Sequence, residues 1–274
     1  MATSAAAFTA IERILAEDPR QRGIAALVQW GALEAAARAL FTARRVIVVS
    51  GFYLPVPQQG ETDGPPGAKA IGQALGALGA TVDYVSDAPH LPLFAAMGTP
   101  AIAYAPDLLD RLRPTHLVAT ERPGRAADGR YYSMAGRDVT AHTAPIDELF
   151  LRAPALGLPT VAIGDGGNEI GMGNVQHLVR RYVPNGALIA SVVPADHLIV
   201  AGVSNFGAYG LVAALSLLAG RDLLPADEAA AGDVRACVAA GACCGHSFRN
   251  EPLVDGTPLE ASLEVLARLR ACLR

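Results

Sequence analysis

The chain has 274 residues, of which 51% are hydrophobic, 18% charged and 5% aromatic, and its formal net charge is −4. This balance supplies ample apolar material for a packed core and excludes a disordered chain. Acidic and basic residues are mixed without a basic stripe, which argues against a nucleic-acid partner. No apolar stretch reaches the roughly 20 residues of a membrane span, and the N-terminus lacks the basic region of a signal peptide, so we expect a cytoplasmic protein without a membrane partner.

Two helices are predicted at the start of the chain. Residues 5–43 carry apolar side chains at roughly helical spacing, and Asp18-Pro19 interrupts them. From Arg45 the pattern changes to short, β-branched, nearly continuous apolar runs, which are typical of strands buried on both faces of a parallel sheet. These runs are Arg45–Gly51, Thr81–Ser86, Ala101–Ala105, His116–Thr120, Thr160–Gly164, Leu188–Val193 and Leu198–Val203.

Helical patterns lie between most of these runs. They are Ala68–Leu78, Ile146–Ala153, Gly173–Tyr182 and Asn205–Ala219, with a last helix at Leu259–Cys272. The alternation predicts an α/β fold with a mostly parallel sheet flanked by helices on both faces, and an N-terminal helical segment. We expect one domain over residues 1–274, on which residues 1–43 pack. The Ala- and acid-rich segment Pro225–Asp233 is interpreted as a loose surface connection.

Ligands bind beyond the carboxyl ends of the strands in such sheets, so the loops that follow strands are of interest. The loop after Arg45–Gly51 holds Glu61 and Asp63 between glycines. Two carboxylates on a stiff turn repel each other, and a bound cation would relieve that repulsion. A solvated turn is the alternative, because Asp-Gly and Pro-Gly are ordinary turn dipeptides.

The loop at residues 160–174, TVAIGDGGNEIGMGN, gives the strongest signal. Asp165, Asn168 and Glu169 offer oxygen ligands that suit Mg²⁺ or Mn²⁺, on a loop whose glycines allow a close backbone approach. A helix is expected to begin near Asn168, and its free amides could hold an anion. Acidic residues that merely cap a helix are the alternative. The glycine spacing matches neither a dinucleotide fingerprint nor a Walker loop.

Two further loops carry candidate binding residues. Arg122 and Arg125 follow the strand His116–Thr120 and could bind a carboxylate or phosphate, or could form a solvated basic loop. Asn205 opens a helix after the last strand, where a helix cap is the simpler interpretation. Adjacent Cys243 and Cys244 lack the paired spacing of a structural zinc site, so reduced thiols are expected.

Taken together, five segments resemble the C-terminal domain of the D-glutamate cyclase family. They are GETDGPPGA, ERPGRAADGRYY, PIDELF, GDGGNEIGMG and AGVSNFGAYG, and they occur from about residue 45 onward in the family's order. The resemblance implies a lyase that closes D-glutamate to 5-oxo-D-proline with loss of water. Such a reaction needs groups for two substrate carboxylates, a carboxylate base for the amine, and a Lewis acid or fixed donors for the oxyanion.

On this basis we expect a divalent cation, Mg²⁺ or Mn²⁺, held by Asp165 and Glu169 with Glu61 and Asp63. Whichever of Glu61 and Asp63 is free of the metal would serve as the general base. The set expected to bind and orient the substrate is Arg122, Arg125, Asn168 and Asn205.

The same residues leave two other functions open. A metal-dependent phosphate-ester hydrolase also uses acidic loops with a cation and nearby arginines. A non-catalytic binding domain for an anionic metabolite would be stabilised by its ligand without turnover. In each case the expected partner is a small anionic molecule, and the apolar composition is compatible with a homo-oligomer.

Overall fold

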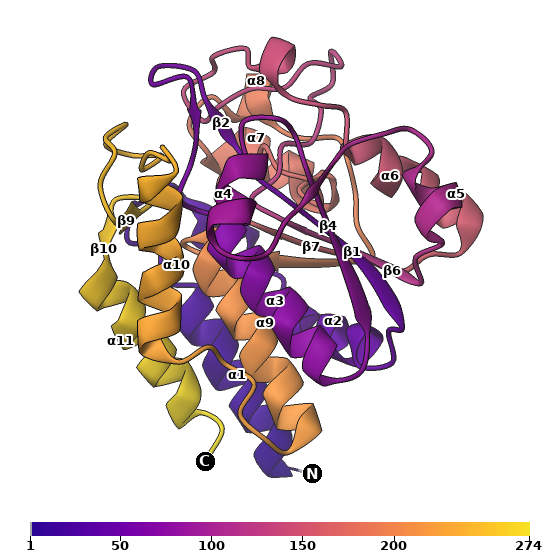
Figure 1. Ribbon diagram of the computed structural model, residues 1–274, viewed down its shortest axis with the longest axis vertical. Coiled ribbons are helices and arrows are strands. Elements are labelled where there is room, and N and C mark those ends of the chain that lie inside the picture. Colours follow the sequence, from indigo (N-terminus) through magenta and orange to yellow (C-terminus); the bar gives the residue numbers. More distant parts are fainter. Residues whose placement is uncertain (1) are drawn as a thin grey trace.

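The computed structural model of the chain describes residues 2–274, with side chains from residue 5 onward. Its centre is a six-stranded sheet in the order β5-β4-β1-β6-β7-β8, in which all pairs are parallel (Figure 1). The strands are β1 (Arg45–Ser50), β4 (Thr81–Ser86), β5 (Ile102–Ala103), β6 (His116–Thr120), β7 (Thr160–Gly164) and β8 (His197–Val200). This doubly wound order reverses direction between β1 and β6, which is where such sheets bind ligands.

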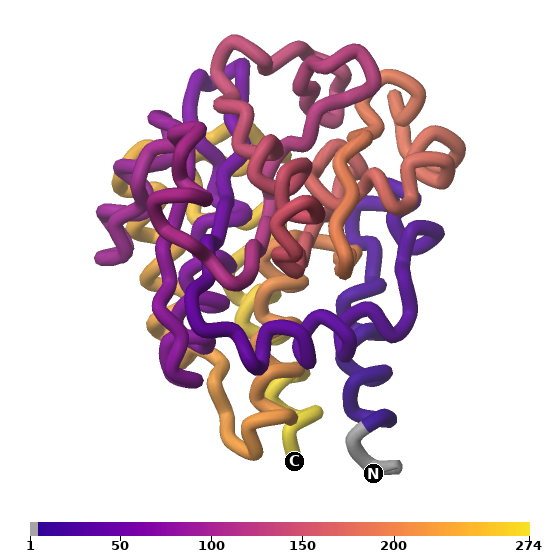
Figure 2. The backbone as a smooth tube through the Cα atoms, turned by 90° about the vertical axis from the view of Figure 1, so that its right-hand side faces the viewer, coloured from indigo at the N-terminus to yellow at the C-terminus, as the bar shows by residue number. Residues whose placement is uncertain are grey.

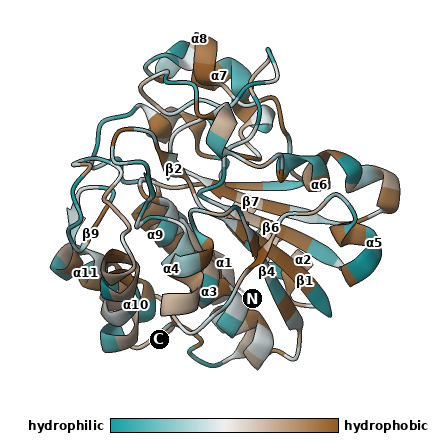
Figure 3. Cartoon of the chain, turned by 45° about the horizontal axis from the view of Figure 1, so that its top comes forward, coloured by the Kyte–Doolittle hydropathy of each residue, from teal (hydrophilic) through white to brown (hydrophobic). Residues whose placement is uncertain are grey.

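The central strands β1, β6 and β7 are buried on both faces because helices cover both faces. Val46 and Val48 of β1 belong to one core cluster, and Ile47 and Val49 belong to the other. This division follows from the two-residue period of a strand, which turns successive side chains to opposite faces. Hydrophobic colours accordingly run along the central sheet and the helices packed on it (Figure 3).

A helix near the end of the chain, α9 (Ser204–Ala219), lies at the centre of one face. It contacts α1 (Ala2–Leu15), α2 (Ala32–Leu40), α3 (Pro65–Ala77) and α11 (Leu259–Ala271). Two further helices pack together on this side, α4 (Leu91–Ala96) and α10 (Asp227–Ala239). Residues Ser204 to Ser216 of α9 are all buried, which explains why its sequence is apolar on every side.

The opposite face carries shorter helices. These are α5 (Leu108–Leu112), α6 (Asp147–Arg152), α7 (Gln176–Tyr182), α8 (Gly186–Ile189) and the 3₁₀ turns at Ile24–Leu27, Thr140–His142, Pro154–Leu156 and Gly173–Val175. Long loops join them to the strands, and the tube view shows these loops gathered at the end of the molecule away from the chain termini (Figure 2). Two small antiparallel hairpins complete the fold: β2 (Tyr53–Leu54) with β3 (Gln59–Gly60), and β9 (Leu253–Val254) with β10 (Thr257–Pro258).

The α/β architecture with its N-terminal helical segment confirms the sequence prediction, but three segments differ from it. Leu188–Val193 is not a strand, because α8 ends at Ile189 and the residues after it bond to the loops at Arg125 and Gly167 rather than to the sheet. The predicted loose connection Pro225–Asp233 instead begins α10, whose alanines and N-terminal acids favour a helix.

The third difference concerns the loop after β7. No helix begins near Asn168, because Gly167 and Gly171 have φ values of +98° and +93° and the helix α7 starts only at Gln176. Among residues 2–274, no helix is long and apolar enough to cross a lipid bilayer.

Candidate active site

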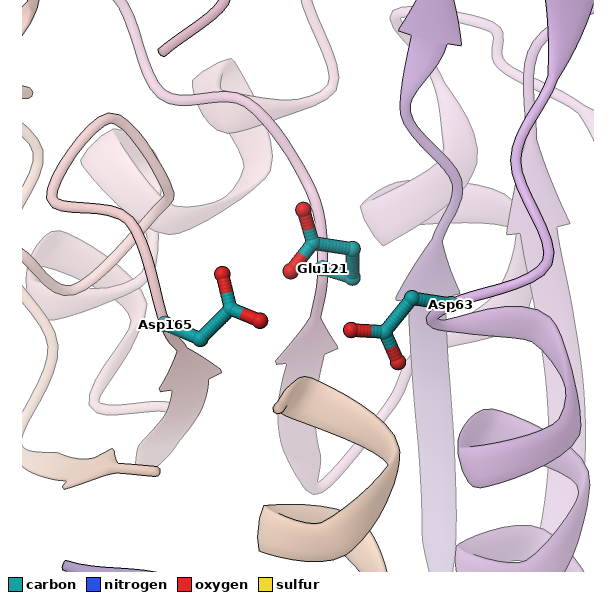
Figure 4. Close-up of side chains that lie close together, drawn as sticks. All are labelled: Asp63, Glu121 and Asp165. Carbon is teal, nitrogen blue, oxygen red and sulfur yellow. The ribbon is translucent and has the colours of Figure 1, made fainter. Parts of the chain in front are cut away.

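Three buried carboxylates meet at the carboxyl edge of the sheet. Asp63 follows β1 and the β2–β3 hairpin, Glu121 is the first residue after β6, and Asp165 is the first residue after β7. One oxygen of each lies within 4.8 Å of the others, and the three side chains point toward one another (Figure 4). Glu121 has a φ of +44°, a strained value for a residue with a side chain, and residues strained in this way tend to cluster at functional sites.

The N-terminus of α9 supports this acidic cluster. The N–H of Ser204 donates to Asp63 Oδ2 at 3.0 Å and to Asp165 Oδ2 at 3.2 Å, and the N–H of Asn205 donates to Asp63 Oδ1 at 2.7 Å. The Ser204 hydroxyl donates to Glu121 Oε2 at 2.6 Å. The free amides and the positive end of the helix dipole therefore favour negative charge at this point.

Three more carboxylates surround the cluster, and Arg22 balances part of the charge. Glu61, Glu169 and Asp255 are buried, at 6%, 1% and 7% exposure. Arg22 reaches in from the loop after α1, with its Nη1 2.7 Å from Asp165 Oδ1 and its Nη2 paired with Asp255. Even with Arg20 near Asp255, six carboxyl groups beside the Arg22 guanidinium would leave a large negative excess if all were ionised, which a buried site does not tolerate without protons or a cation.

The pKa values of the buried acids show the same excess of negative charge. Burial, followed by repulsion from neighbouring carboxylates, raises the pKa values of Glu61, Asp63 and Glu121 well above their usual range. The same two causes raise the pKa of Glu169 and that of Asp255 to about 7. Without a cation, the folded chain therefore holds protons that carboxyl groups normally release by pH 5.

A cavity of about 310 Å³ opens onto the acids. Its lining includes Glu61, Asp63, Glu121, Asp165, Asn168, Arg22, Asp255, Arg137 and His246, together with apolar side chains near the opening. Asn168 donates from Nδ2 to the Tyr132 carbonyl at 2.7 Å, whereas its Oδ1 is buried without a hydrogen-bond partner among the described residues. Such an acceptor is costly when unsatisfied, so it is a natural contact for a ligand N–H group.

Of the residues expected from the sequence, Glu61, Asp63, Asp165 and Asn168 line this cavity. Glu169 turns back on its own loop, where Oε1 accepts from the N–H groups of Asp165 and Gly166 at 2.8 and 2.6 Å. Its Oε2 accepts from the N–H of Gly167 at 2.7 Å. The Glu169 carboxylate thus satisfies the N–H groups that the expected helix start would have offered to an anion, and it fixes the shape of the loop.

The other three expected residues are engaged elsewhere. Asn205 Oδ1 accepts from the N–H groups of Gly64 and Gly67 at 3.0 and 2.9 Å, and so caps α3. Arg122 is fully buried and lies 2.7 Å from an Asp87 oxygen. Arg125 forms a two-point ion pair with the fully buried side chain of Asp147, at 2.7 and 3.0 Å.

Sequence reasoning missed Glu121, Arg22 and Asp255. Glu121 follows β6 in the same way that Asp165 follows β7, so its position at a strand end was the available signal. Arg22 and Asp255 come from opposite ends of the chain, and Arg20 donates to the Asp255 carbonyl at 2.8 Å to hold that turn in place. The four cysteines are free thiols, as expected, and none belongs to the acidic cluster.

Comparisons with known proteins show which proteins this chain is similar to. The human mitochondrial D-glutamate cyclase is 37% identical over 237 residues, an alignment that covers 76% of this chain and 38% of the relative. The chain thus spans well under half the length of that protein. A crystal structure of an exopolyphosphatase-related protein from Bacteroides fragilis superposes with a TM-score of 0.48 at 9% identity, covering 90% of this chain and 58% of that one, which is too distant to support an argument.

The family model described as D-glutamate cyclase-like, C-terminal, matches residues 11–270, nearly the whole chain and every loop of the site. With this match and the human relative, the chain belongs to the D-glutamate cyclase-like family.

Proposed function

We propose that this chain closes D-glutamate to 5-oxo-D-proline with loss of water, assisted by a divalent cation at Asp63, Glu121 and Asp165. The observation that carries the proposal is the close approach of these three buried carboxylates, within 4.8 Å, in a chain of this family. The human relative bears the name of this activity but is much longer, so the activity is proposed for this chain on the strength of its own site.

The donor set fits a small, hard cation. Mg²⁺ and Mn²⁺ prefer carboxylate oxygens, and the excess negative charge of the site is what a divalent ion would neutralise. The amides of α9 also hold Asp63 and Asp165 in fixed orientations, so little reorganisation would be needed on binding. A cation at this point would polarise the γ-carboxyl group of the substrate and stabilise the oxyanion formed on attack.

Ring closure moves two protons. The substrate ammonium loses two hydrogens as its nitrogen becomes the ring amide, and the departing γ-carboxyl oxygen gains two hydrogens to leave as water. Carboxyl groups of raised pKa can both accept and return protons near neutral pH. Glu61 suits this role better than Asp63, because both Asp63 oxygens accept backbone N–H groups, whereas the Glu61 carboxylate accepts no backbone N–H among residues 5–274.

Substrate recognition is assigned to one of the expected residues, Asn168, and to one that was not expected, Arg137. Arg122 and Arg125 are paired with carboxylates of the protein, so we assign a substrate carboxylate to Arg137, an exposed residue of the lining with no ion-pair partner among residues 5–274. The unpartnered Oδ1 of Asn168 is assigned to the substrate amine. Holding the amine near the γ-carbon in this way supplies much of the rate gain of an intramolecular reaction.

The test is to incubate the purified chain with D- or L-glutamate, with Mg²⁺, Mn²⁺ or a chelator, and to follow 5-oxoproline by chiral chromatography. We expect product from the D isomer alone, and only when a cation is present. A Glu61→Gln variant should retain cation binding and lose turnover, while Asp110→Asn, a change of an exposed carboxylate away from the site, should behave like the parent chain.

Product formed in chelator would contradict the cation assignment alone. No product under any condition would contradict the cyclase function. Release of phosphate from a general phosphate ester would then favour the hydrolase interpretation.

A further inference from the structure

The cavity above the acids has an apolar wall. Phe52, Leu54 and Val56 come from the β2–β3 hairpin, Met134 from the loop after β6, and Phe248 from the loop before β9. Two of these side chains are open to solvent at the mouth, with Val56 52% exposed and Phe248 42% exposed. D-glutamate, with a charge at each end, offers this wall nothing beyond its short methylene chain.

Phe248 is also held in a costly conformation. Its φ is +56°, in the left-handed region that residues with bulky side chains rarely adopt. Strain of this kind persists where the surrounding structure needs a side chain in one place, and it concentrates at ligand clamps. The exposed phenyl ring is therefore held at the mouth of the cavity, where it can contact a ligand.

The size of the cavity agrees with a ligand larger than glutamate. Its volume of about 310 Å³ falls within the range of roughly 300–1,000 Å³ found for sites that hold drug-sized molecules. Such sites combine apolar walls with a few placed polar groups, and here the buried acids share the lining with the exposed apolar side chains of Val56 and Phe248.

We propose, on the basis of the cyclase function above, that the site also closes γ-amides of D-glutamate in which the γ-amide nitrogen carries an apolar group. The D-glutamyl part would occupy the acidic end, and the apolar substituent on the γ-nitrogen would lie against Val56 and Phe248. The carboxyl oxygens and amine of the D-glutamyl part would keep the contacts assigned for D-glutamate.

The chemistry of this reaction balances without a further reactant. The α-nitrogen forms a bond to the γ-carbon, and the bond from the γ-carbon to the amide nitrogen breaks. The two hydrogens lost by the α-ammonium pass to the departing nitrogen, which leaves as an ammonium ion instead of water. The same proton transfer through Glu61 serves both leaving groups.

The experiment compares three substrates with the full chain and cation: D-glutamate, γ-D-glutamyl methylamide and γ-D-glutamyl benzylamide. Production of 5-oxo-D-proline and of free amine is followed for each. We expect the benzylamide to exceed the methylamide at least tenfold in kcat/KM, since a hydrophobic contact of this size discriminates by about 10- to 200-fold.

Variants at the mouth locate the source of this preference. Phe248→Asn is compatible with a positive φ, and Val56→Ser is a small change at an exposed position. Each should reduce the preference for benzylamide several-fold while leaving turnover of D-glutamate unchanged. Trp30→Ser, which removes an apolar side chain that is 60% exposed outside the cavity, is the matched control and should change neither value.

The outcomes separate this inference from the function on which it depends. Turnover of D-glutamate with no turnover of either amide would overturn the inference and leave the cyclase function intact. Turnover of the amides without D-glutamate would overturn the dehydrating reaction and support the inference. Equal rates for the two amides, or an unchanged preference in Phe248→Asn, would overturn the role of the apolar wall.

Discussion

Raising the pH should destabilise the cation-free chain over a range in which most proteins change little. Burial and the neighbouring Asp165 raise the pKa of Asp255 from 3.8 to about 7. Between these two pH values the folded state keeps a proton that the unfolded state releases, so the free energy of unfolding falls as the pH rises. The stabilisation is fully present below about pH 4 and is lost by about pH 7.

The size of the effect follows from the width of that range. A difference of about three pH units, at about 1.4 kcal/mol per unit, corresponds to about 4 kcal/mol from Asp255 alone. Glu169, whose pKa is raised to about 7 by burial and Asp165, acts in the same direction. A loss of this size is a large part of the 5–15 kcal/mol by which domains are usually stable.

A divalent cation should reverse the loss. Binding at a concentration about 100 times the dissociation constant adds about 2.7 kcal/mol, and the gain should be larger at pH 8 than at pH 5 because protons compete for the same oxygens. The assay is urea denaturation at pH 5, 6, 7 and 8, in chelator and in Mn²⁺. Asp255→Asn is the control, since it removes one titrating group and should flatten the slope in chelator by up to about 1.4 kcal/mol per pH unit. A chelator-treated chain that is as stable at pH 8 as at pH 5 would refute the reasoning.

Three further predictions concern single side chains. Asp165→Asn should abolish cation binding, measured by calorimetry, and turnover, while circular dichroism shows an unchanged fold; unchanged cation affinity would remove Asp165 from the site. Arg125→Met should cost about 3–5 kcal/mol in thermal or urea unfolding, because it leaves the fully buried Asp147 without its ion-pair partner and with only the Tyr131 hydroxyl and a backbone N–H as donors, yet KM for D-glutamate should stay the same. A raised KM with unchanged stability would restore Arg125 as a substrate residue. Gly245→Ala should lower kcat more than stability, since its added Cβ would lie 2.3 Å from Glu61 Oε2, the far end of a flexible side chain. Loss of folding instead would show that the loop backbone cannot adjust.

The centre of the sheet could be predicted because its strands are short, continuous in sequence and apolar on both faces. β1, β4, β6 and β7 lie within a residue of the predicted runs, because short β-branched apolar stretches favour buried parallel strands. Leu188–Val193 has the same composition but is not a strand. It follows Asn185, whose φ is +58°, and its first two residues belong to the short helix α8. Composition alone does not distinguish these two cases.

Only the part of the site that lies in the loops after strands could be predicted from the sequence. Asp63 and Asp165 stand in glycine-rich loops that mark them, and the structure brings both together with Glu121. Arg22 and Asp255 are separated by most of the chain, and their pairing depends on tertiary packing that no local pattern records. The residue type of Arg122 and Arg125 predicts that they bind a carboxylate, but it does not say which one. In the structure they pair with Asp87 and Asp147 of the protein itself.

The helix that begins at the acids also passes through the most crowded part of the core. An added Cβ at Gly207 would lie 2.5 Å from Ile163, and one at Gly210 would lie 2.6 Å from Leu15, so α9 lies close against both the sheet and α1. A helix wedged in this way has little freedom to slide along its axis, and Ser204 and Asn205 at its tip have correspondingly little freedom to follow a larger ion. The acids should therefore select by ionic radius, accepting Mg²⁺ or Mn²⁺ and discriminating against Ca²⁺. Bonds to oxygen are about 2.0–2.1 Å for Mg²⁺ and about 2.3–2.6 Å for Ca²⁺.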